Sequence, residues 1–190
     1  MNSAVNDCLL IKKSPIHNKG VFARNNIASN VKLIEYIGRK VTKKESREIE
    51  KKAISLSITD KSLARTYIFK LDDDFDIDGD VEGNDAKYFN HSCNPNAKYL
   101  YEHNRIWIVS IRNVRKGDEI TFNYGFGFDE DFKDHPCKCG AKNCAGYILD
   151  EEDWPKLNRA TQQRRQRQQQ ELSLENEGAN KGGQRTSASP

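Results

Sequence analysis

Three cysteines within eight residues constrain the fold of this chain more than any other feature. They lie in CKCGAKNC, residues 137–144, as Cys137, Cys139 and Cys144. Structural zinc takes four ligands in a tetrahedron and prefers thiolates. A loop this short can bring three thiolates to one ion, but it leaves the fourth position open. Another segment must therefore fold back onto this loop.

The fourth ligand can be chosen from four residues, Cys8, Cys93, His91 and His135. Cys8 lies in an apolar run, where a cysteine usually packs as a small core residue. His135 is close in sequence, but histidines are common on surfaces. Cys93 lies in the turn-rich stretch NHSCNPNA, which gives a thiol no packing role, so we favour it. The alternative, scattered free thiols, is disfavoured by the spacing.

Length and charge exclude several classes of protein. A chain of 190 residues can form one compact domain with a tail. Its net charge of +3 does not indicate a basic nucleic-acid-binding protein. No run of about 18 apolar residues could span a membrane, and the start MNSAVNDCLLIKK does not resemble a signal peptide. We therefore expect an intracellular protein without membrane contact, whose cysteines bind metal or react rather than form disulfides.

Short runs of β-branched and aromatic residues predict a mainly β fold with a few short helices. Thr42 and Glu45 have the spacing of a capping box, which predicts a helix over residues 43–56. Trp107 is expected in the core, because its strand is apolar on both faces. The expected strands lie in residues 8–41, 65–71, 105–111 and 119–125.

Two segments are rich in charge. From about residue 158 the chain becomes Gln- and Arg-rich, which predicts a disordered tail with at most a short helix at its start. Its basic residues can make weak contact with nucleic acid or another acidic surface. Residues 72–85 hold eight carboxylates. They form either a solvated loop or an acidic lip that attracts a Lys/Arg-rich substrate.

Five motifs, in order, resemble those of the SET-domain protein lysine methyltransferases, and most closely the trithorax-like branch. The resemblance covers residues 9–148. Two departures are Asn18, where the family often has glycine, and Asp78-Gly79-Asp80, where relatives commonly have Asp-Ala. Asn18 tolerates the positive φ that this position can require. The matching stretches are SPIHNKGVFA, LIEYIG, NHSCNPNA, KGDEITFNYGF and the post-SET motif CKCGAKNC.

The resemblance implies a SET-domain fold of short sheets, in which a knot-like crossing threads the C-terminal part beneath Asn90 and His91. It also implies that Cys93 joins the three clustered cysteines around one structural zinc, which clips the post-SET loop beside a lysine channel. The expected divisions are an N-terminal extension at 1–7, a SET domain at 8–130, a post-SET zinc region at 131–149 and a C-terminal segment at 150–190.

The resemblance also implies an S-adenosylmethionine-dependent protein lysine N-methyltransferase. Tyr124 matches the catalytic tyrosine. Phe122, two residues earlier, matches a position where phenylalanine favours addition of two or three methyl groups. Tyr67 can also be interpreted as a cross-strand packing residue. The implied cofactor contacts are His17, Lys19, Tyr67, Asn90, His91 and Lys138, and the substrate channel is lined by Tyr99, Phe122 and Phe126.

The substrate is expected to be a basic protein with an exposed lysine, most often a histone tail in this family. The expected location is the nucleus or chromatin in a eukaryote, and the cytoplasm or a secreted effector in a bacterium. The alternative function is a catalytically inactive, zinc-containing module that binds nucleic acid or protein through its tail. The joint presence of Asn90, His91 and Tyr124 favours the enzyme.

Overall fold

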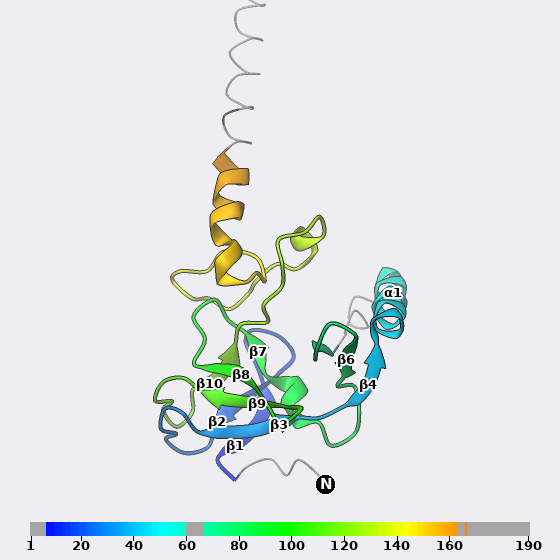
Figure 1. Cartoon of the computed structure of the whole chain (residues 1–190). Coiled ribbons are helices and arrows are strands. Elements are labelled where there is room, and N and C mark those ends of the chain that lie inside the picture. Colours follow the sequence, from blue (N-terminus) through cyan, green and yellow to red (C-terminus); the bar gives the residue numbers. More distant parts are fainter. Residues whose placement is uncertain (1–6, 60–66, 163–165, 167–190) are drawn as a thin grey trace, which may run out of the picture.

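Ten short strands form three small sheets in the part of the chain that the computed structural model describes, residues 7–59, 67–162 and 166 (Figure 1). The prediction of a mainly β fold with few helices is confirmed. The first sheet has the order β1 (Leu9–Lys13), β2 (Lys19–Ala23), β10 (Glu119–Phe122), β7 (Asn90–His91). The second is β3 (Lys32–Tyr36), β9 (Arg105–Ser110), β8 (Ala97–Glu102). The third is β4 (Arg39–Thr42), β6 (Phe75–Asp78), β5 (Ile68–Lys70).

The core lies between the first two sheets. Leu9, Val21 and Ile120 from the first sheet pack against Ile106 and Ile108 from the second, and each is almost fully buried. Burial of such aliphatic side chains is the main favourable term in folding. The predicted core position of Trp107 is wrong in part, because this side chain is only half-buried. Its register neighbours are Glu35 and the exposed Leu100.

The acidic stretch is not a simple solvated loop, since β6 runs through it. Phe75 and Ile77 alternate with Asp76 and Asp78, the two-residue period of a strand. Asp76 is buried, and its carboxylate accepts hydrogen bonds from Ser46 Oγ at 2.6 Å and Lys43 Nζ at 2.5 Å. The stretch is therefore partly neutralised by basic partners in the third sheet and α1.

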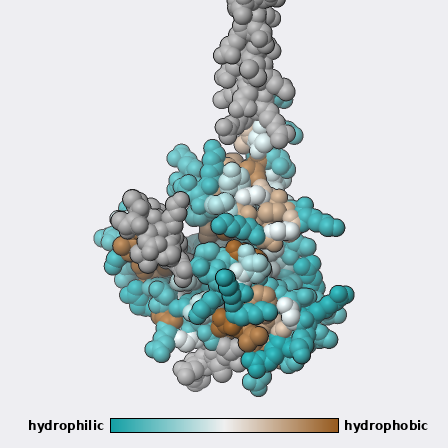
Figure 2. Space-filling view, turned by 180° about the vertical axis from the view of Figure 1, so that it is seen from behind, coloured by the Kyte–Doolittle hydropathy of each residue, from teal (hydrophilic) through white to brown (hydrophobic). Residues whose placement is uncertain are grey.

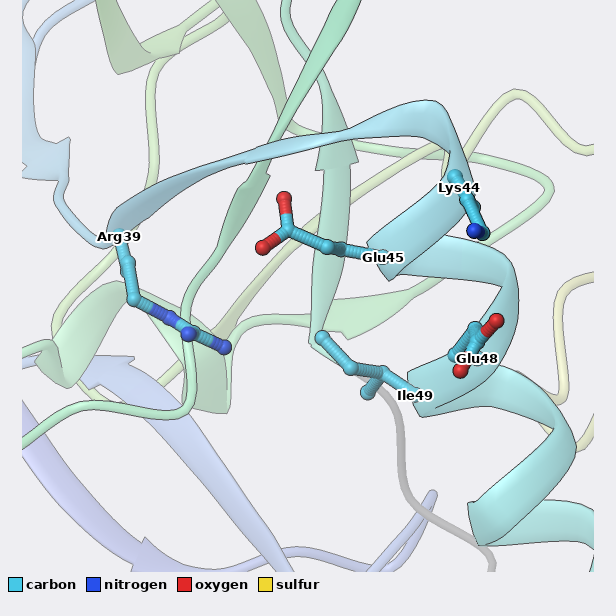
Figure 3. A pocket seen from close by; sticks show the side chains of 5 residues that line it. All are labelled: Arg39, Lys44, Glu45, Glu48 and Ile49. Carbon is cyan, nitrogen blue, oxygen red and sulfur yellow. The ribbon is translucent and has the colours of Figure 1, made fainter.

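The helix α1 (Lys43–Thr59) begins at the predicted capping box and ends beyond the predicted residue 56. Thr42 N donates to Glu45 Oε2 at 2.8 Å, and Glu45 N donates to Thr42 Oγ1 at 3.3 Å. Figure 1 shows α1 above the upper end of β4. A small open depression beside β4 is lined by Arg39, Lys44, Glu45, Glu48 and Ile49 (Figure 3). None of these five residues belongs to the predicted site.

The described residues also contain three short 3-10 helices, η2 (Asp85–Tyr88), η3 (Phe132–Asp134) and η4 (Glu151–Asp153). Residues 154–162 are helical and lie above the sheets in Figure 1, so a helix runs into the start of the expected tail at about residue 158. The rest of the expected tail, apart from residue 166, lies outside the described residues.

The surface facing away from the viewer in Figure 1 is mainly hydrophilic, with apolar residues in small separate patches (Figure 2). Among the described residues, no helix is both long enough and apolar enough to cross a membrane.

Candidate active site and metal centre

A parallel pairing between β7 and β10 assembles the site. Thr121 lies opposite Asn90 and Phe122 opposite His91. Asn96, in the same turn-rich stretch, holds this pairing because its amide accepts from Thr121 N at 2.9 Å and donates to Glu119 O at 2.8 Å. The chain after β10 therefore passes beside Asn90 and His91, as the resemblance implies.

Tyr124 follows β10 and is held at both ends. Its hydroxyl donates to Phe89 O at 2.9 Å, and its main-chain N–H donates to His91 Nδ1 at 3.2 Å. Burial raises the pKa of Tyr124 well above its usual range, and the nearby Tyr67 raises it further. The hydroxyl is consequently a neutral donor and acceptor at physiological pH.

The His91 ring joins Tyr124 to the cysteine cluster. Burial lowers the pKa of His91 to about 4, so the ring is neutral near pH 7. Because Nδ1 accepts from Tyr124 N, the ring proton belongs on Nε2, which lies 3.6 Å from Cys93 Sγ.

Aromatic rings pack around Tyr124. The Phe122 and Phe126 ring centroids lie 5.2 and 5.8 Å from that of Tyr124, and Phe122 lies 6.3 Å from Tyr99. Phe122 is buried, whereas Phe126 is 38% exposed and therefore lies at the outer end of the group. The predicted channel residues are thus brought together around the predicted catalytic tyrosine.

Three further aromatic residues, Phe69, Tyr36 and Tyr101, belong to this group and were missed by the sequence analysis. Phe69 lies 5.0 Å from Tyr99 and 5.1 Å from Tyr36, centroid to centroid. The Tyr36 hydroxyl donates to Tyr67 O at 2.7 Å. Tyr36 could have been found from the sequence because it lies in the LIEYIG motif. No motif marked Phe69 as part of the site.

Gly79 explains one departure from the family pattern. A Cβ atom on Gly79 would lie 2.2 Å from the Tyr36 hydroxyl oxygen, so a glycine lets this hydroxyl reach the backbone. Gly79 N also donates to Tyr67 O, the acceptor that Tyr36 uses. Gly79 N and the Tyr36 hydroxyl therefore both hold the main-chain carbonyl of Tyr67, whose half-buried ring lies 5.4 Å from Lys87 Nζ.

The predicted cofactor loop lies against Asn90. Its turn is closed by Ser14 N donating to Asn18 O at 2.9 Å, and Asn18 has a φ of +41°, as expected. Asn90 Nδ2 donates to Lys19 O at 3.0 Å and lies 3.4 Å from His17 O. Lys138 lies between Cys137 and Cys139 in the sequence, and its side chain is exposed.

The four cysteine sulfurs of the expected ligand set gather in one place. Among the described residues, Cys93, Cys137, Cys139 and Cys144 alone form a group with metal-ligating character, and their sulfurs all lie within 4.8 Å of one another. The Cys93 sulfur is 3.8 Å from Cys137 and 3.9 Å from Cys144. Zinc–sulfur bonds of about 2.3 Å give a tetrahedral edge of about 3.8 Å. The cluster therefore fits a tetrahedral ion, and neither Cys8 nor His135 belongs to it.

Main-chain N–H groups support a thiolate at Cys139, whereas burial raises the pKa of Cys93 to about 11 and raises the pKa of Cys137 as well. Cys139 N and Gly146 N point at the sulfurs of Cys137 and Cys144. Burial raises the pKa of Cys139, but bonds from the N–H groups of Cys93 and Ala141 lower it to about 6. The donor set is therefore suited to a soft cation.

Comparison with known proteins identifies the family. Residues 18–125 match the SET domain. The chain is similar to "Histone-lysine N-methyltransferase, H3 lysine-4 specific" of Aspergillus oryzae, with 34% identity over 72% of this chain and 11% of the relative. The namesake in Saccharomyces cerevisiae is 31% identical over 74% of this chain and 13% of the relative.

A third relative, "Histone-lysine N-methyltransferase trithorax" of Drosophila virilis, is 31% identical over 75% of this chain and 4% of its own length. The chain thus spans only a small part of the curated relatives it matches. The SET-domain match itself covers more than half of the chain, and it includes Tyr124, Phe122 and the paired strands β7 and β10, but not Phe126. The chain belongs to the SET-domain family.

Proposed function

We propose that this chain is an S-adenosylmethionine-dependent protein lysine N-methyltransferase. The observation that carries the proposal is the half-buried Tyr124, whose neutral hydroxyl is held beside the paired Asn90 and His91 at the inner end of an aromatic group. An inactive binding module would have no use for this combination. We retain residues 8–130 as the proposed SET domain and 131–149 as the proposed post-SET region.

A lysine amine must be neutral to act as a nucleophile. Its ordinary pKa of about 10.4 makes deprotonation unfavourable by roughly 4 kcal/mol near neutral pH. The aromatic walls disfavour the ammonium form by desolvation. Tyr124 Oη and Phe89 O, 2.9 Å apart, provide oxygens that can orient the amine. Proximity and orientation then supply much of the rate.

S-adenosylmethionine would supply the methyl group on its sulfonium. The residues proposed to hold it are the cofactor loop at His17 and Lys19, together with Asn90 and His91. Asn90 is already bonded to the loop through Lys19 O, so two sides of the binding site are fixed to each other. Tyr67 and Lys138 complete the proposed set, Tyr67 beside the channel and Lys138 between two cysteines.

The metal is proposed to be one structural zinc ion, held by Cys93, Cys137, Cys139 and Cys144. Four thiols at tetrahedral spacing support zinc as the ion. The post-SET loop between the cysteines contributes no fully buried apolar side chain, so its order would depend on the metal. Through Cys93, the ion would also hold the His91 ring that bonds Tyr124.

The proposed substrate is a histone tail, and the proposed location is the nucleus. Two of the relatives above are named as specific for lysine 4 of histone H3, which makes that lysine the first to test. We also propose, from its Arg-rich sequence, that the tail contacts nucleic acid.

Mass spectrometry of histone H3 tail peptides tests this proposal. The zinc-loaded protein should methylate the native peptide, and replacement of the peptide's fourth residue, the lysine in question, by arginine should abolish the product. Methylation of the replaced peptide at another lysine would support the proposed methyltransferase activity but contradict the choice of lysine 4 as its target. Absence of any product with both peptides and with whole histones, while the protein still binds basic peptides, would favour the binding module.

A further inference from the structure

The Glu119 carboxylate lies at the junction between the proposed cofactor loop and Asn90. Ser14 Oγ lies 2.8 and 2.9 Å from its two oxygens, and Asn90 Nδ2 donates to Oε1 at 2.7 Å. Ser14 and Asn90 are both more than nine-tenths buried, and Glu119 is half-buried. Three separate segments of the chain therefore meet at one carboxylate.

This junction determines which way the Asn90 amide faces. Glu119 and Lys19 O, at 2.7 and 3.0 Å from the same terminal atom of Asn90, are both acceptors without a proton to donate. That atom must therefore be the NH2 group. A flipped amide would place its oxygen against two acceptors, one of them charged.

The amide oxygen is consequently presented on the other side. No donor in the described part of the chain is bonded to Asn90 Oδ1. In that part of the chain, every buried polar side-chain atom except Trp154 Nε1 has a hydrogen-bond partner. Because Asn90 Oδ1 has no partner, it is not a buried atom, and solvent or a ligand can reach it. The oxygen is thus available to a hydrogen-bond donor.

The charge of Glu119 points to a cationic donor. Within the described residues, no basic side chain forms an ion pair with this carboxylate. The side chains hydrogen-bonded to it, Ser14 and Asn90, are both neutral. A half-buried carboxylate without a counter-ion favours a ligand that brings positive charge.

Gly20 makes this close approach possible. A Cβ atom there would lie 2.2 Å from Glu119 Oε1 and 2.9 Å from Ser14 Cβ. The glycine at the end of the cofactor loop is therefore required by the position of the carboxylate. Its φ is not in the left-handed region, so backbone conformation is not the reason.

We propose that Glu119 is a positioning residue of the cofactor site: it fixes the Asn90 amide with its oxygen directed at the α-ammonium group of the cofactor. This inference rests on the proposed function and adds to it the residue that orients Asn90. Glu119 need not touch the cofactor. It acts because a carboxylate can only accept, whereas a glutamine in its place could donate and would permit the flipped amide.

Calorimetric titration with two ligands tests the inference. The ligands are S-adenosylhomocysteine and its analogue without the α-amino group, each titrated into the zinc-loaded protein. E119Q should weaken binding of S-adenosylhomocysteine by about tenfold, the size expected for a hydrogen bond to a charged group. The same variant should change the affinity for the deaminated analogue by less than about twofold, since that ligand lacks the ammonium.

Two further variants complete the experiment. S14A removes the hydrogen bond from Ser14 to the carboxylate. It should weaken binding of S-adenosylhomocysteine by less than E119Q does, and it should leave the affinity for the deaminated analogue unchanged. This variant tests the inference if E119Q does not fold. E48Q, the same change at an exposed site on α1, should alter neither affinity. If E119Q weakened the binding of both ligands equally, or did not weaken the binding of S-adenosylhomocysteine, the role of Glu119 would be contradicted but the proposed function would not. A wild-type protein that binds neither ligand would instead contradict the proposed function, and the inference with it.

Discussion

His91 Nε2 lies 3.6 Å from the sulfur of Cys93, while the other nitrogen of the ring accepts a hydrogen bond from Tyr124 N at 3.2 Å. One buried imidazole thus links the proposed metal centre to the proposed catalytic residue. Loss of the metal should therefore affect catalysis as well as the order of the post-SET loop.

The first prediction concerns the metal. Purified protein should contain one zinc per chain, and C93S should lower both the zinc content and the rate of methyl transfer, because it removes a ligand and the contact with His91. Metal analysis and turnover on a histone peptide measure the two effects. C8S is the matched control and should change neither. If C8S reproduces the losses and C93S does not, the ligand assignment is wrong.

The second prediction concerns the hydroxyl of Tyr124. Y124F keeps the ring contacts with Phe122 and His91 but leaves Phe89 O without its donor. Turnover should fall by about a hundredfold, the size expected when a reacting group loses its orientation. Cofactor affinity should stay near the wild-type value, since the hydroxyl acts on the amine. Calorimetry and single-turnover kinetics separate the two, and near-normal turnover would reject the role.

The third prediction concerns pH. Burial holds the pKa of Tyr124 above its usual value of about 10, so the neutral hydroxyl persists through pH 10. The rate on a histone peptide should rise from pH 7 to pH 10 as the substrate lysine loses its proton, without a descending limb from Tyr124. Circular dichroism at each pH checks that the fold is retained. A descending limb below pH 10 that disappears in Y124F would show that the tyrosine titrates in this range.

The fourth prediction concerns the number of methyl groups added. Phe122 is buried against Tyr124 and offers no oxygen to hold an amine or a water. Wild type should form dimethyl- or trimethyl-lysine, and F122Y should shift the product towards monomethyl-lysine. A difference of about 1.4 kcal/mol is enough to change product ratios tenfold. Mass spectrometry at high enzyme concentration resolves the products, and a wild type that stops at monomethyl-lysine would reject the prediction.

F122Y needs a control for folding. If Phe122 only packs within the aromatic group, the added hydroxyl would lower the melting temperature without changing the product. F126Y, at the exposed end of the group, adds the same oxygen farther from Tyr124 and should leave the product unchanged.

Features that depend on local spacing could be predicted from the sequence. The capping box at Thr42 and Glu45 uses only neighbouring residues, and the helix begins there. The preference for Cys93 over Cys8 rested on the local setting of each thiol, and the four sulfurs do gather. Asn18 was expected to tolerate a positive φ, which it adopts.

Features that depend on tertiary neighbours could not be predicted in this way. β6 was hidden because Asp76 is buried only through partners on α1, which no pattern within residues 72–85 reveals. The need for Gly79 comes from Tyr36, more than forty residues earlier in the chain. Glu119 likewise drew no attention as part of a strand, because its partners Ser14 and Asn90 lie in separate segments.

Methyl transfer to a histone lysine by this chain can be measured directly with methyl-tritiated S-adenosylmethionine and core histones. The zinc-loaded protein should label histone H3, and Y124F, at equal concentration and with matched cofactor binding, should label it at least about a hundredfold more slowly. Equal labelling by wild type and Y124F, or no labelling of any histone or lysate protein by a wild type that binds the cofactor, would contradict the account.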